Sequence, residues 1–414
     1  MLFRSFLLEV LQAEDESNSD VAVVYPILQR RQHLLDDTFA QLLQQYARYV
    51  FSQERVERVI VTAFAIENLC NNIQQFPLGS RADNLEIAIT GYHALLEVYT
   101  RDRLPKYWAK TKNSLGNAYC KRIRGNKAYN LELAIVAFEE ALKEYKRDVF
   151  PEDWAMTQNN LGNAYSERIT GKKADNLELA IEAFENALEV YKRDASSYEW
   201  ATTQNNLGLA YYERIKGERA DNIEKAIAAL NPLLEVYTRD AYPHEWADTQ
   251  NNLGIAYLYR IRGERTDNTE LAIMAFEEAL KVYPRDTFPE KWAVIQNSLG
   301  LAYSDRIKKE RADNLESAIV AFNLSLEVCT REAFPYEWAR LQNNLGIAYS
   351  NRIRGERADN LELAIVAYNP EVLNVKILRI LSKLCIGIDD TKFEQLMTLF
   401  SINKGFYLGE TQTL

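Results

Sequence analysis

Tryptophan recurs in this chain at one fixed interval of 46 residues. All six tryptophans keep it: Trp108, Trp154, Trp200, Trp246, Trp292 and Trp338. Leu-Gly pairs and one asparagine share the interval, as Leu161-Gly162 and Asn176 illustrate. A unit repeated in this way builds an array in which each copy packs on its neighbours, so the chain is not expected to form a globular domain around one core.

The charge balance narrows the range of partners. The chain carries 59 acidic and 49 basic residues, a net charge of -10, and shows no lysine or arginine cluster. We therefore expect neither nucleic acid nor an anionic membrane surface as partner. No apolar run approaches membrane-spanning length, and Glu9 interrupts the apolar start.

Cysteine usage argues against a metal or disulfide framework. The 4 cysteines are scattered and contain no CxxC pair. Together with the charge balance, this pattern predicts a cytoplasmic protein without membrane insertion, metal or cofactor.

Residues 151–196 show what one unit contains. Pro151 suits the first turn of a helix, and apolar residues follow at spacings of three and four from Trp154 to about Ile169. We name this predicted helix, helix A, and expect its tryptophan to fill the junction between successive units. Gly171 fits the stop of helix A, where a left-handed residue is common.

A second helix, helix B, is predicted after this stop. Asp175 and Glu178 form a capping-box pattern at its start. Leu177, Phe184 and Leu188 mark its apolar face at helical spacing. The unit is therefore a helical hairpin, and neither helix buries its apolar face without the next hairpin.

The hairpin resembles a known repeat family. The order and local spacing of the tetratricopeptide signature are matched by Leu161, Gly162, Tyr165, Ala180, Phe184 and Ala187. Since the usual tetratricopeptide period is about 34 residues, the resemblance is to its long-repeat branch. The run from Pro151 through Trp154-Ala155 and Thr157-Gln158-Asn159-Asn160-Leu161 looks like kinesin light chain repeats. It looks equally like bacterial arrays that precede a caspase-like (CHAT) protease domain.

This resemblance implies an all-α, right-handed superhelical solenoid of antiparallel helix hairpins. We place the array at residues 80–370. It is expected to begin with a single helix B, followed by the equivalent of six full A/B repeats. Residues 1–79 are expected to form an N-terminal cap of two or three helices. They lack the sustained heptads with which kinesin light chains bind the motor heavy chain, so that partner is implied by resemblance alone.

The end of the array is less regular. The register is lost after residue 371, and residues 371–414 are predicted to be a C-terminal cap or a divergent tail. Residues 372–401 could supply two short helices, while a truncated or frameshifted end is the alternative. Pro232 falls inside a helix B and is expected to kink it.

No catalytic arrangement stands out. The chain has 3 histidines, which lie far apart at positions 33, 93 and 244, and no strand-like alternation surrounds a cysteine. The recurring carboxylates Asp175 and Glu178 fit helix caps better than acid/base pairs. The recurring arginine, represented by Arg168, fits an ion pair with a neighbouring loop acid. We expect no enzymatic activity.

The face of helix A opposite Leu161 and Tyr165 is the predicted binding surface, since the resemblance places helix A on the concave side. This face carries Asn159, Asn160, Asn205, Asn206, Asn251, Asn252, Asn343 and Asn344. An amide both donates and accepts hydrogen bonds, as an extended peptide backbone requires, and tetratricopeptide grooves hold peptides through such asparagines. The alternative is that one asparagine of each pair ties adjacent hairpins together.

Apolar residues stand beside these asparagines: Leu209, Ile255, Leu301 and Ile347. They could seat ligand side chains, or the next helix A could partly bury them. The middle of the face is acidic, with Glu167, Glu213, Asp248 and Asp305. It therefore favours a neutral or basic segment with apolar anchors over the acidic cargo peptides of kinesin light chains.

These patterns together predict a non-enzymatic scaffold or adaptor that binds a peptide or partner helix in its concave groove. The alternative is the recognition or regulatory array of a bacterial caspase-like (CHAT) protease system whose protease domain is absent from this chain. A third interpretation is self-association through the open C-terminal end of the array.

Overall fold

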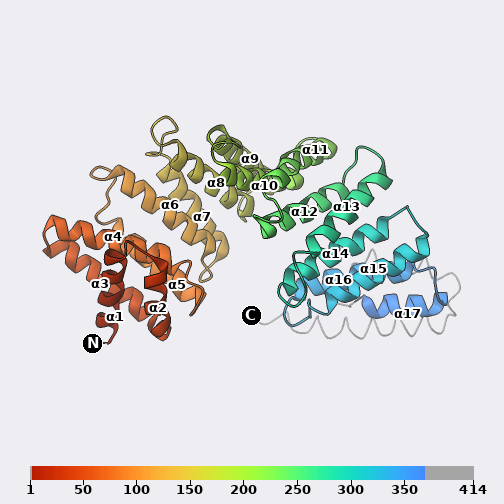
Figure 1. Cartoon of the computed structure of the whole chain (residues 1–414), viewed down its shortest axis with the longest axis horizontal. Helices are drawn as coiled ribbons and strands as arrows, with labels where there is room; N and C mark the ends of the chain where they lie inside the picture. The colour runs from red at the N-terminus through yellow and green to blue at the C-terminus, as the bar shows by residue number, and fades with distance from the viewer. Residues whose placement is uncertain (1, 369–414) are drawn as a thin grey trace, which may run out of the picture. The chain divides into compact units, whose positions relative to one another are not determined.

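The computed structural model describes residues 2–368, and every regular element among them is a helix (Figure 1). The predicted all-α solenoid of helix hairpins is confirmed. The chain divides into two compact units, at residues 1–229 and from residue 230 onwards, which are described separately. The predicted C-terminal cap at 371–414 lies outside the described residues. Within 2–368, no helix is both long and apolar enough to cross a membrane.

The helices of the first unit begin with four that precede the predicted array. They are α1 (Leu2–Glu16), α2 (Val21–Arg30), α3 (Asp37–Gln53) and α4 (Val56–Ile73), with a short 3-10 helix η1 (Gln32–Leu34) before α3. The leading helix B and three repeats follow as α5 (Arg81–Leu95), α6 (Pro105–Lys121), α7 (Lys127–Ala141), α8 (Pro151–Glu167), α9 (Lys173–Val190), α10 (Ser197–Glu213) and α11 (Arg219–Leu230).

The second unit continues the alternation of A and B helices. Its elements are η2 (Asn231–Glu235), α12 (Pro243–Leu258), α13 (Arg265–Leu280), α14 (Pro289–Asp305), α15 (Arg311–Leu326), α16 (Pro335–Ser350) and α17 (Arg357–Ala367). Within the units, a helix A packs on the helix B that follows it, as α8 does on α9 and α12 on α13, and a helix B packs on the next helix A, as α13 does on α14.

A glycine lets the two helices of a hairpin approach closely. A Cβ added to Gly162 of α8 would lie 2.6 Å from Cε1 of Phe184 on α9. Phe184 is only 1% exposed, so its ring fills the space that a side chain at Gly162 would need. Four further pairs share this arrangement: Gly116 with Phe138, Gly254 with Phe276, Gly300 with Phe322, and Gly346 with Tyr368.

The periodic tryptophan lies at the junction between hairpins, as expected. Trp154 is half-buried and packs both against the cluster around Ala141 and Tyr145 and against the cluster around Ala187. The guanidinium of Arg147 lies 5.9 Å from the centroid of its ring, a cation–π geometry. The same pairing recurs at Trp108, Trp200, Trp246, Trp292 and Trp338.

The predicted capping box is wrong. Helix α9 starts at Lys173, so Asp175 lies in its first turn and makes no cap bond. The loop is closed instead by Asn176, whose Nδ2 donates to the carbonyls of Arg168 at 3.2 Å and Thr170 at 2.8 Å. Asp175 and Glu178 pair instead with Lys216 and Arg214 of the next repeat.

Ile169 also departs from the prediction. Helix α8 ends at Glu167, and Ile169 lies in the following loop with 61% of its surface exposed. It therefore belongs to no buried helix face. The equivalent isoleucines of the other repeats are exposed as well: Ile123, Ile215, Ile261, Ile307 and Ile353.

The N-terminal region holds four α-helices, where two or three were expected. Helix α4 packs on α5 as a helix A packs on a helix B, and its buried face contains Ala63, Ile66 and Cys70. Val56 and Ile60, in the first turns of the same helix, are exposed.

Pro232 ends the α-helical part of its helix B, where a kink was expected. Helix α11 ends at Leu230, and the chain continues as the 3-10 helix η2. Proline has no N–H to donate, and its ring clashes with the carbonyl four residues earlier. The proline therefore ends the α-helix rather than only bending it.

Candidate functional site on the A helices

Asparagine side chains join the A helices of successive repeats. Nδ2 of Asn160 on α8 donates to Oδ1 of Asn113 on α6 at 3.1 Å. The same bond recurs from Asn206 to Asn159 at 3.2 Å and from Asn344 to Asn297 at 3.0 Å. We call these three bonds the asparagine ladder. Each rung links the second asparagine of one repeat to the first asparagine of the repeat before it.

The ladder bears on the predicted peptide-binding asparagines. Asn159, Asn160, Asn206 and Asn344 each place one amide group in a rung, which supports the alternative that asparagines tie hairpins together. Their remaining amide groups retain hydrogen-bonding capacity. The other predicted asparagines, Asn205, Asn251, Asn252 and Asn343, are half-buried on the A helices. A role of these residues in peptide binding stays a prediction.

One rung is missing in the second unit. The residue whose side chain would donate to Asn251 is Ser298; four other repeats have asparagine at this position, and the first repeat has Ser114. The Ser298 hydroxyl donates instead to the Val294 carbonyl of its own helix at 3.2 Å. Oδ1 of Asn251 is consequently buried without a hydrogen-bond partner among residues 2–368. Such a buried unpaired acceptor typically costs about 1–3 kcal/mol.

A pocket of about 310 Å³ opens at this missing rung. Helix α12 contributes Asp248 and Asn251, and helix α14 contributes Glu290, Lys291, Val294 and Ile295. The volume lies at the lower end of the range of about 300–1,000 Å³ that is common for ligand pockets. We call this cavity the Asn251 pocket.

The Asn251 pocket carries an excess of negative charge. Lys291 Nζ lies 2.7 Å from Asp248 Oδ1, and the hydroxyl of Tyr283 donates to the same oxygen at 3.0 Å. Burial and the nearby Asp248 carboxylate raise the pKa of Tyr283, so its hydroxyl keeps its proton. Glu290 is exposed and has no hydrogen-bond or ion-pair partner within the described range. Two carboxylates therefore face one ammonium group.

The predicted apolar anchors fall into two groups. Leu209 and Ile347 are exposed, and they remain available to a ligand. Ile255 and Leu301 are half-buried against the core that includes Phe276, as the alternative interpretation held. Val294, which is exposed in the pocket wall, was not among the predicted site residues.

The acidic middle of the A-helix face is largely neutralised. Glu167, Glu213 and Asp305 each pair with the cation that begins the helix B of the preceding repeat. These pairs are Lys127 with Glu167 at 3.0 Å, Lys173 with Glu213 at 3.0 Å, and Arg265 with Asp305 at 2.5 Å. The prediction of a neutral or basic ligand assumed that these carboxylates are unpaired. Since three of them form ion pairs, the electrostatic argument for a basic ligand now depends on the Asn251 pocket.

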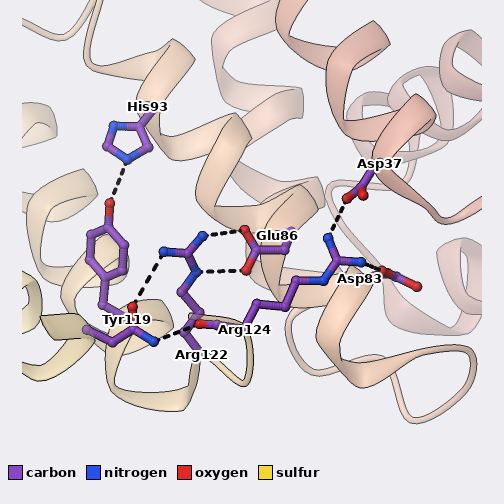
Figure 2. Close-up of polar contacts among 8 residues, drawn as sticks. Asp37, Asp83, Glu86, His93, Tyr119, Arg122 and Arg124 are labelled. Carbon is purple, nitrogen blue, oxygen red and sulfur yellow. Dashed lines mark hydrogen bonds and ion pairs between the residues drawn. The ribbon is translucent and has the colours of Figure 1, made fainter. Parts of the chain in front are cut away.

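The recurring arginine clamps a helix A to the helix B before it, as Arg122 does for α6 and α5. Figure 2 shows Arg122, whose Nε and Nη2 donate to the two carboxylate oxygens of Glu86 at 2.7 and 2.8 Å. The partner is thus a glutamate within a helix, where a loop acid was predicted. Equivalent bidentate clamps join Arg168 to Glu132, Arg214 to Glu178, Arg306 to Glu270 and Arg352 to Glu316.

His93 also takes a structural position. Its Nε2 lies 2.8 Å from the hydroxyl of Tyr119 (Figure 2). Three later repeats have a glutamate at the position of His93, as in the bond from Tyr165 to Glu139 at 2.8 Å. Burial, followed by the charges of Lys112 and Arg122, lowers the pKa of His93. Among the described residues no three His, Cys, Asp or Glu side chains are grouped to hold a metal ion.

Comparisons with known proteins do not assign a family. No protein-family model matches the chain, and a search of curated proteins gives no match. One similar solved structure is described as a "Circular tandem repeat protein with novel repeat topology and enhanced subunit contact surfaces". It is 14% identical over 98% of both chains, with a TM-score of 0.24. A TM-score this low does not establish a shared fold. The assignment of a helical repeat array therefore depends on the helix hairpins of this chain.

Proposed function

We propose that this protein is a non-enzymatic scaffold or adaptor that binds an extended peptide or a partner helix along its A helices. The observation that carries the proposal is the missing rung of the asparagine ladder. Oδ1 of Asn251 is buried and unpaired beside a cavity, and an N–H donor from a ligand would satisfy it.

The lining of the Asn251 pocket indicates the kind of ligand. Asp248 and Glu290 outnumber Lys291, while Val294 and Ile295 supply an apolar wall. A lysine or arginine side chain combines N–H donors with an aliphatic stem and has no acceptor. A neutral or basic segment with apolar anchors therefore fits better than an acidic one.

Two biological settings are consistent with this activity. The resemblance to kinesin light chains favours a cytoplasmic cargo adaptor, with a motor heavy chain as second partner. The resemblance to bacterial arrays favours a recognition or regulatory role beside a separately encoded caspase-like protease. Co-purification of the intact chain with a protease, or with a motor subunit, distinguishes the two settings.

Ser298→Asn tests the proposed site. The new amide supplies the missing donor to Asn251, as Asn344 does for Asn297. We expect the unfolding free energy to stay equal or to rise by about 1 kcal/mol, while peptide affinity falls at least tenfold. The probe is a fluorescent peptide selected by display against the intact chain, and the measurement is fluorescence anisotropy.

A matched control is Ser317→Asn on helix α15. The Ser317 hydroxyl makes the same type of bond, to the Asp313 carbonyl four residues earlier at 3.0 Å, but it lies on a helix B. This variant should bind the selected peptide normally. Equal affinity of wild type and Ser298→Asn would refute the site, and selection of mainly acidic peptides would refute the proposed charge preference.

A further inference from the structure

A second cavity, of about 400 Å³, lies in the first unit where the turn between α4 and α5 meets the end of α6. Its charged lining residues are both cations, Arg81 at the start of α5 and Lys121 at the end of α6. Gln74 and Phe76 contribute from the turn. We call this cavity the Lys121 pocket.

The chain itself shows what normally occupies this place. In three other repeats the cation that begins helix B pairs with an acid near the end of the next helix A, for example Lys127 with Glu167 at 3.0 Å. At α5 the cation is Arg81, and the position of the acid is held by Lys121. Neither forms an ion pair with any residue in the described part of the chain. Two like charges therefore flank a cavity where other repeats have a salt bridge.

Arg81 is held in place by the backbone. Its Nη1 donates to the carbonyl of Gln74, as Lys173 Nζ does to the carbonyl of Ser166 at 2.8 Å. Helix α5 begins at Arg81, so the positive end of the helix dipole lies at the pocket. The Ser80 hydroxyl caps only the N–H of Asp83, at 3.3 Å.

Gln74 provides an independent indication of a ligand. Gln74 is one of the residues that line the Lys121 pocket, and it is only 7% exposed. Nε2 donates to the hydroxyl of Tyr92 at 2.9 Å, and that hydroxyl donates to Oδ1 of Asn71 at 2.7 Å. In this arrangement the Tyr92 proton goes to Asn71, so the N–H end of the Gln74 amide faces Tyr92. Oε1 of Gln74 then has no partner within residues 2–368, and a ligand that donates one hydrogen bond would satisfy it.

We propose that the Lys121 pocket binds a phosphate group that retains one P–OH. Its charged oxygens accept hydrogen bonds from Arg81 and Lys121, and its hydroxyl donates to Oε1 of Gln74. A carboxylate lacks the proton for Gln74, and sulfate has the shape and charge of hydrogen phosphate without that proton. The Lys121 pocket shares no residue with the Asn251 pocket of the proposed function, so either site can fail without the other.

The test is calorimetric titration of the full chain with inorganic phosphate, sulfate, acetate and phosphoserine. We expect saturable binding of phosphate, with sulfate and acetate at least tenfold weaker. Phosphoserine is titrated at a pH of about 5.5, below its second pKa of about 6, so that it too retains a P–OH. Tight binding would identify a phosphorylated partner as the source, and weak binding would identify the free ion; both agree with a phosphate site. Absence of saturable phosphate binding, or sulfate binding as tight as phosphate, would overturn the proposal.

Lys121→Glu is the decisive variant because it rebuilds the ion pair of the other repeats. It should lose phosphate affinity at least tenfold, while its thermal midpoint stays equal or rises. Lys143→Glu makes the same charge change at an exposed position beyond α7 and should bind phosphate normally. Lys121→Gln removes the charge without adding an acid and should also weaken binding. Equal losses in Lys121→Glu and Lys143→Glu would show general charge attraction and contradict a defined site.

Discussion

Substitution of Gly162 by alanine tests the packing within a hairpin. The new methyl group would lie 2.6 Å from Cε1 and 2.7 Å from Cδ1 of Phe184, whereas carbon atoms pack at about 3.5–4.0 Å. The ring or the helices must therefore move by roughly 1 Å. Overpacking of this kind lowers the unfolding free energy by about 1–3 kcal/mol. Alanine has a higher helix propensity than glycine, which offsets up to about 1 kcal/mol of this loss. We expect a net loss of about 1–2 kcal/mol.

The assay is urea unfolding followed by circular dichroism, for Gly162→Ala, Phe184→Leu and the double variant. If the methyl group and the ring collide, the smaller leucine relieves the collision. The double variant should then be more stable than the sum of the two single losses predicts, by at least about 0.5 kcal/mol. Additive losses, or a Gly162→Ala variant that gains stability, would refute the proposed contact.

Three further outcomes are expected. Lys309 has φ +68° where the equivalent Gly263 has φ +78°, so Lys309→Gly should raise the urea midpoint by relieving about 1 kcal/mol of left-handed strain; a lower midpoint would contradict this. The hydrogen bond from Arg214 lowers the pKa of Glu178 below its ordinary value of 4.5, so this clamp stabilises the fold above that pH and is lost as the pH falls through the folded value. Thermal midpoints measured from pH 7 to pH 3 should fall less steeply for Glu178→Gln. Trp154→Ala should cost about 3 kcal/mol by urea unfolding, because the half-buried ring joins two clusters, and a change within about 0.5 kcal/mol would show a surface position.

The 46-residue period was sufficient to predict the hairpins, because apolar spacing within one unit determines which faces two adjacent helices bury. It could not identify contacts between units. Arg168 and Glu132 are 36 residues apart, and the sequence shows only that both recur. The capping prediction failed for a similar reason, since Asn176 bonds backward across a loop whose path the spacing does not define.

The candidate sites were only partly accessible from the sequence. A repeated asparagine suits a ligand and a neighbouring repeat equally well, because both use the same amide groups. The informative positions are departures from the period, Ser298 and Lys121, and both are visible in the sequence. The structure was needed to show the consequence of each departure: Asn251 has no hydrogen-bond donor opposite its Oδ1, and Arg81 has no acidic partner.

Because the arginine–glutamate clamps between repeats are equivalent, a whole 46-residue unit can be deleted from the array or added to it. Arg214 meets Glu178 with the same sequence separation and the same bidentate geometry with which Arg168 meets Glu132. Excision of residues 151–196 would therefore bring Arg214 to the position of Arg168, opposite Glu132, with no new interface to be formed. Duplication of a unit would be equally conservative. The gene for such a chain can lengthen or shorten by recombination between its own repeats, and each product inherits complementary surfaces.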